Sequence, residues 1–151
     1  MINYADAMDE IRQTFVDKWE ADSASIVGYI PEVRYANLEK KETPDGSKYW
    51  VRVSVQTASE EQSTLSNCEG LPGQKRFTNF GVAIIQIFCP KSDVRSNELG
   101  EKLAMLSRNA YRGKATKGRV WFRNTRIQEL APEELFYRFN VVTEYEYDEL
   151  A

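Results

Sequence analysis

The chain has 151 residues, of which 42% are hydrophobic, so its length and composition predict a single folded domain over residues 1–151. The net charge is −3 and histidine is absent, which implies no general attraction to nucleic acid and excludes Ser-His-Asp sites, Cys-His sites and most zinc sites. The sequence shows neither a membrane-spanning apolar run nor a secretory signal, so we expect a cytoplasmic protein.

Two amphipathic helices are predicted from apolar residues that recur at helical spacing. The first covers residues 4–21, and its apolar stripe is Met8, Ile11, Phe15 and Trp19. The second covers residues 93–111, and its stripe is Leu99, Leu103, Leu106 and Ala110. We expect Ser92 to cap the start of the second helix and Gly113 to stop it.

Four strands are predicted from alternation or from continuous apolar runs: Tyr49–Gln56, Phe77–Pro90, Arg119–Gln128 and Leu135–Tyr147. The turn signal Thr43–Gly46 suggests that a short stretch around Val33 and Tyr35 forms a hairpin with the first of them. In the last strand every odd position is large and mostly apolar, which predicts one buried face. This strand is longer than a compact core needs, so the sheet should project and favour assembly.

Residues 58–75 are polar and have no sustained period, which predicts a long mobile loop between strands. Helix, hairpin, loop, strand, helix and hairpin follow one another along the chain. This order predicts an α+β fold, with a single mostly antiparallel sheet and two helices packed on one side.

Charge is segregated near the C-terminus. Seven bases and no acid lie in residues 108–126, whereas residues 127–151 hold seven acids and one base. Three interpretations are open: cross-strand ion pairs within one subunit, head-to-tail association between copies, or a basic patch on a nucleic-acid backbone.

No motif indicates catalysis. The Gly70–Lys75 segment lacks the spacing of a phosphate-binding loop. Four acids of the first helix spread around it and are expected to face solvent: Asp6, Asp9, Glu10 and Asp17. We therefore predict no catalytic, metal-binding or cofactor-binding residue and no enzyme activity.

Three segments carry a resemblance to a known family. They are the first helix with Trp19, the strand Gly81–Pro90 that runs directly into a leucine-striped helix, and the terminal strand segment Val141–Asp148. Together they resemble the tail terminator, or tail completion, proteins of lambda-like long-tailed bacteriophages and prophages.

The resemblance implies a structural protein of virion assembly that is found in the virion tail, and in the host cytoplasm during assembly. It would form a ring, expected to be hexameric, on the last ring of the tail tube, stop tube polymerisation and offer the head-joining surface. The implied partners are further copies of the chain, the tail tube protein and a head–tail connector or neck protein, with no membrane and no sequence-specific nucleic acid. Another neck or head-closure component and a cytoplasmic ligand- or nucleic-acid-binding module are the alternatives.

Two sets of residues are predicted to carry this function. The subunit-interface set is Arg112, Lys114, Lys117, Arg119, Arg123, Glu144, Glu146 and Asp148. The tube-contact set, which is expected to become ordered on meeting the tube, is Glu60, Glu61, Leu65, Leu71, Lys75 and Arg76.

Overall fold

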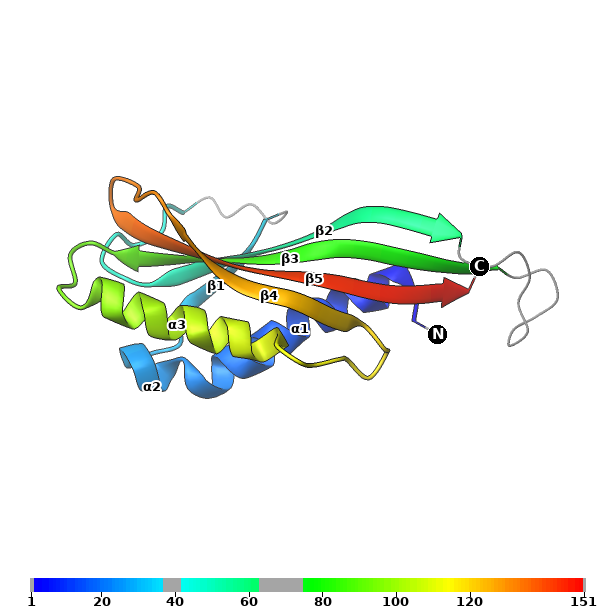
Figure 1. Ribbon diagram of the computed structural model, residues 1–151. Coiled ribbons are helices and arrows are strands. Elements are labelled where there is room, and N and C mark those ends of the chain that lie inside the picture. The colour runs from blue at the N-terminus through cyan, green and yellow to red at the C-terminus, as the bar shows by residue number, and fades with distance from the viewer. Residues whose placement is uncertain (1, 37–41, 63–74, 151) are drawn as a thin grey trace.

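The computed structural model describes residues 2–36, 42–62 and 75–150. Within these ranges one five-stranded sheet runs in the order β1-β2-β3-β5-β4, with helices against one face (Figure 1). The first pair is parallel and the other three pairs are antiparallel. The strands are β1 (Glu32–Tyr35), β2 (Trp50–Gln62), β3 (Arg76–Pro90), β4 (Trp121–Leu130) and β5 (Phe136–Leu150). The α+β prediction with a mostly antiparallel sheet is confirmed.

The helices are α1 (Tyr4–Asp22), the short α2 (Ala24–Val27) and α3 (Ser96–Tyr111). The Asn3 side chain caps α1 by accepting a hydrogen bond of 2.8 Å from the Asp6 amide. Both predicted apolar stripes are buried and form one core with the helix-facing side of the sheet. Among the described residues, no helix combines the length and apolar character that crossing a membrane requires.

β2, β3 and β5 extend beyond β4 toward the end where the C-terminus lies (Figure 1). We call this extension the arm: residues 60–62 of β2, 76–79 of β3 and 147–150 of β5. The loop predicted over 58–75 is therefore too long, because residues 58–62 are part of β2. Their side chains are exposed, so they show no apolar alternation, and backbone pairing with β3 defines this part of the strand. Residues 63–74 lie outside the described residues.

The predicted hairpin at the start of the sheet is wrong. β1 runs parallel to β2, with Glu32 opposite Trp50 and Tyr35 opposite Val53. Residues 36–49 are long enough to return the chain to the start of its neighbour, as a parallel connection requires. A turn signal inside this connection does not distinguish it from a hairpin.

Two element starts differ from the prediction. α3 begins at Ser96, its N-cap position is Arg95, and no side chain caps it there, so the Ser92 cap is wrong. The Asp93 carboxylate instead accepts a hydrogen bond of 2.9 Å from the Arg95 amide, in a turn that precedes the helix. β4 begins at Trp121, because Arg119 takes a left-handed conformation (φ 64°) in the preceding turn.

The alternation of β5 holds from Phe139 onward, where the odd positions to Tyr147 are buried. At its start the pattern fails: Leu135 and Tyr137 are exposed, whereas Phe136 is buried. Phe136 packs on the other side of the sheet, edge-on to the stacked rings of Trp50 and Phe88, whose centroids are 3.9 Å apart. This second aromatic cluster explains why both faces of β5 carry large side chains there.

Candidate interaction surface

The chain between α3 and β4 forms a tight turn with four exposed bases. The Arg119 amide donates to the Thr116 carbonyl at 3.0 Å, and the Thr116 amide donates to the Val120 carbonyl at 2.9 Å. We call residues 112–119 the basic turn, and its bases are Arg112, Lys114, Lys117 and Arg119. No ion pair among the described residues involves any of these four side chains.

Glu10 of α1 holds the basic turn in place. Its carboxylate accepts hydrogen bonds from the Thr116 hydroxyl at 2.5 Å and from the Gly118 amide at 3.1 Å. A side chain at residue 118 would meet the ends of the Glu10 and Ile2 side chains, so glycine allows the close approach. The expectation that Glu10 faces solvent is therefore wrong: this carboxylate is part-buried and fixes a loop more than 100 residues away.

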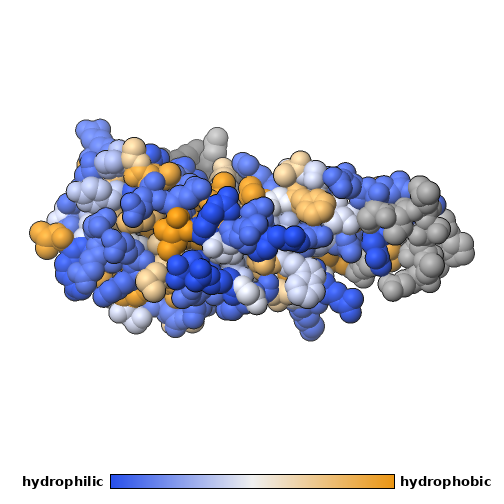
Figure 2. Space-filling view, in the orientation of Figure 1, coloured by the Kyte–Doolittle hydropathy of each residue, from blue (hydrophilic) through white to orange (hydrophobic). Residues whose placement is uncertain are grey.

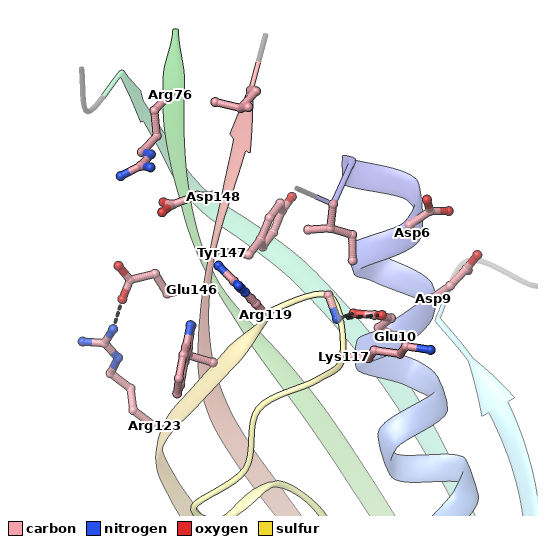
Figure 3. Close-up of a pocket in the computed structure, with 14 residues that line it drawn as sticks. Asp6, Asp9, Glu10, Arg76, Lys117, Arg119, Arg123, Glu146, Tyr147 and Asp148 are labelled. Carbon is pink, nitrogen blue, oxygen red and sulfur yellow. Dashed lines mark hydrogen bonds and ion pairs between the residues drawn. The ribbon is translucent and has the colours of Figure 1, made fainter. Parts of the chain in front are cut away.

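A cleft of about 1170 Å³ lies between the basic turn, the start of α1 and the arm (Figure 3). Both signs of charge line it. Asp6 and Asp9 come from α1, Lys117 and Arg119 from the basic turn, and Asp148 from β5. Trp121 also lines it with 58% of its surface exposed. The cleft suits a partner segment that carries charges and an apolar contact.

Two acids of β5 pair with two bases of β4. Arg123 forms an ion pair with Glu146, and Arg126 pairs with Glu144 at 3.3 Å. These ion pairs match the first interpretation of the segregated charge, which is cross-strand pairing within one subunit. Exposed pairs of this kind typically contribute under about 1 kcal/mol, so they orient the side chains more than they stabilise the fold.

The structure thus divides the predicted subunit-interface residues into two groups. In the first group, Arg123 pairs with Glu146, and Glu144 pairs with Arg126. Asp148 belongs to the same group, because it accepts a hydrogen bond of 2.7 Å from Thr78. The four bases of the basic turn are exposed on the surface.

The predicted tube-contact residues do not form one loop. Glu60 and Glu61 lie in β2 with exposed side chains, and Arg76 begins β3 and lines the cleft. Lys75 directly precedes β3. Leu65 and Leu71 lie outside the described residues.

Two tyrosines of β5 pack in the core where the arm begins. Tyr145 and Tyr147 are buried, with ring centroids 6.1 Å apart. Burial raises the pKa of the Tyr147 hydroxyl above its ordinary value, and the Glu149 charge adds to the effect. Both side chains therefore stay neutral and act as packing groups at physiological pH.

The sequence analysis did not identify Glu10 as part of this surface. In β4, Phe122 is buried, whereas Trp121 is exposed and lines the cleft. The signal in the sequence for the Glu10 contact was the glycine at residue 118, because a glycine allows another group to approach the backbone closely. The face seen in Figure 2 is mainly hydrophilic with small separate apolar groups, so contacts through it depend largely on polar side chains.

No family model matches this chain, and no curated protein matches it. Several solved structures are similar, two of them over nearly the whole chain. One, whose name states no function, has a TM-score of 0.58 at 18% identity, and the match covers 92% of this chain and 94% of that chain. This chain shares its fold. The other is a chain of the virion of a native gene transfer agent particle, with a TM-score of 0.50, 17% identity, and coverage of 97% of this chain and 100% of that chain. At identities this low, the two matches show a common fold alone.

Proposed function

We propose that this chain is a structural protein of a phage or prophage tail. Copies of it assemble as a ring on the end of the tail tube, stop tube polymerisation and provide the surface to which the head is joined. The protein acts through its surfaces, not through chemistry.

The full-length likeness to a virion chain carries this proposal. That match leaves no part of the virion chain uncovered and almost none of this one. A common architecture over nearly all of both chains supports a role as a virion subunit. The resemblance of Gly81–Pro90 and the terminal strand to tail terminators narrows that role to the end of the tail.

The site geometry is consistent with a subunit that binds other subunits. The basic turn presents cations that form no ion pair within the described part of the chain, and Glu10 holds the turn in one conformation. A preorganised charged surface of this kind favours specific association, because the turn loses little conformational entropy when a partner binds. We propose the basic turn as a subunit contact.

A neck or head-closure component is the second candidate, because a virion likeness at this identity fits either position in the particle. The two candidates differ in what limits tail length. A terminator controls the length of the tube, whereas a neck component acts only after the tube is complete.

Deleting the gene from the phage or prophage that encodes the chain tests the proposal. We expect tubes of uncontrolled length under the electron microscope, and tails of normal length when the gene is supplied in trans. Tails of normal length that fail to join heads would favour the neck component. Unchanged, infectious particles would contradict both.

A further inference from the structure

One edge of the sheet is open along most of β2. β1 pairs only with Trp50–Val53, and the Ala36 amide donates to the Val53 carbonyl at 3.1 Å just past its end. From Ser54 to Glu61 no strand in the described ranges pairs with this side of β2. Such an edge offers a row of backbone donors and acceptors to another strand.

The opposite edge is open along most of β4. Its first residues are covered by the basic turn, where Ala115 bridges to Trp121 and the Phe122 amide donates to the Lys114 carbonyl at 3.3 Å. From Arg123 to Leu130 no strand of the described residues lies outside it. Both open stretches also contain one register shift, between Thr57 and Ser59 in β2 and between Arg123 and Arg126 in β4.

We propose that the open edge of β4 in one copy pairs with the open edge of β2 in the next copy, so that one sheet continues across the subunit boundary. This inference rests on the proposed ring-forming function and names the surface that forms the ring. Direction alternates across β2, β3, β5 and β4, so a following β2 continues the antiparallel order. The contact joins two different surfaces, as a closed ring requires.

The position of β1 determines the register. Leu130 lies level with Trp50 across the sheet, through the pairs with Arg138 and Phe88. In the neighbouring copy β1 already pairs with Trp50–Val53 of β2. An incoming β4 must therefore shift along β2 by the length of these residues to reach the open part of the strand. Leu130 then lies opposite Ser54, and Arg123 lies opposite Glu61, which matches the two open stretches from end to end.

This offset has a consequence for the shape of the ring. A shift of four rungs is about 13 Å, and the repeat of four strands is about 19 Å wide. The strands would therefore tilt by about 35° from the ring axis, which is close to the tilt found where sheets close on themselves.

Charge and space agree with the proposed pairing. Glu60 and Glu61 are exposed and form no ion pair with any described residue, and the offset brings them beside Arg123 and the basic turn of the neighbour. Next to the open edge of β2, a groove of about 810 Å³ between α1 and the strand is lined in part by Gln13, Tyr35 and Val55. It leaves room for side chains on the helix-facing side of an added strand.

Cysteine cross-linking tests the register in the assembled protein. The proposed pairing places Gln128 opposite Gln56 with both side chains on the helix-free face, whereas Glu129 points to the other face. Gln56→Cys/Gln128→Cys should form a ladder of disulfide-linked oligomers under mild oxidation at high protein concentration. Gln56→Cys/Glu129→Cys is the matched control and should form several-fold fewer. Both variants carry Cys68→Ser, and native Cys89 is buried.

The outcomes separate this inference from the proposed function. Oligomer mass is measured on the same samples before oxidation, and tail length is scored in the phage. Little cross-linking of the 56/128 pair, or equal cross-linking of the two pairs, overturns the edge-to-edge pairing, even if rings form and tail length is normal. A cross-linked ladder that depends on the 56/128 pair supports the pairing, even if the deletion phenotype places the ring elsewhere in the particle.

Discussion

At the scale of single residues, Glu10 links α1 to the basic turn, and replacing it should loosen both. Glu10→Ala removes the acceptor of the Thr116 hydroxyl and of the Gly118 amide. Hydrogen bonds to a charged group contribute about 1.5–3 kcal/mol, so we expect the free energy of unfolding to fall by about 2 kcal/mol. Urea denaturation measures the change.

Asp9→Ala is the matched control, because Asp9 is the preceding carboxylate on the same helix and, among the described residues, forms only an exposed pair with Arg12 at 3.6 Å. It should change the free energy of unfolding by less than about 0.5 kcal/mol. Equal effects of the two substitutions would contradict the role assigned to Glu10.

A second residue-scale prediction concerns pH. Hydrogen bonds from the Arg95 amide and the Tyr49 hydroxyl lower the pKa of Asp93, and the Tyr49 bond is 2.8 Å long. A lowered pKa in the folded state stabilises the protein above the ordinary pKa, and this contribution disappears as pH falls through the folded-state value. Tyr49→Phe should cost about 1.5 kcal/mol at pH 7, and the difference from wild type should shrink below about pH 4.

Denaturation curves of Tyr49→Phe and wild type at several pH values check this prediction. A difference that stayed constant down to the lowest pH would assign the loss to packing instead of to the Asp93 carboxylate.

At the scale of elements, the close packing of β2 and Tyr145 of β5 against β3 depends on Gly81. A side chain there would meet the backbone carbonyl of Gln56 and the ring of Tyr145. Backbone cannot move aside as a flexible side chain can, so Gly81→Ala should destabilise the fold by about 3 kcal/mol. Thermal or urea unfolding measures it, and a loss below about 1 kcal/mol would mean that this packing adjusts freely.

How far each element could be predicted depended on what defines it. The stripes of α1 and α3 and the apolar run of β3 are defined by burial, so periodicity found them. The end of β2 is defined by backbone pairing between exposed polar residues, which leaves no periodic signal. The direction of β1 is set by its parallel pairing with β2, and local turn residues do not encode this.

The surface was predictable in part for the same reason. Charge segregation is visible in the sequence. One of the three interpretations drawn from it, cross-strand ion pairs within one subunit, matches the pairs found between β4 and β5. The Glu10 contact with Gly118 joins residues 108 positions apart and required the fold.

At the scale of the whole molecule, the basic turn should determine assembly without determining stability. Lys117→Glu/Arg119→Glu reverses two exposed charges, so we expect loss of ring formation with an unchanged melting temperature. The control Lys48→Glu/Lys91→Glu makes the same charge change at the opposite end of the sheet and should assemble normally. Light scattering and thermal unfolding measure both effects, and a normal ring from the first variant would contradict the prediction.

Charge reversal on the partner edge gives a complementary prediction. Glu60→Lys/Glu61→Lys alone should also fail to assemble, because two basic surfaces would then meet. Mixing it with Lys117→Glu/Arg119→Glu should restore rings in which the two variants alternate. Failure of the mixture, with both variants folded, would show that these surfaces do not meet.

Solution mass is the most direct test that this chain is a ring-forming subunit. Light scattering across a protein-concentration and salt series, with negative-stain microscopy of the same fractions, would measure it. The account predicts a closed ring, expected to be hexameric, whose population falls as salt rises because exposed charges contribute to the contact. A monomer at every concentration and every salt level would contradict it.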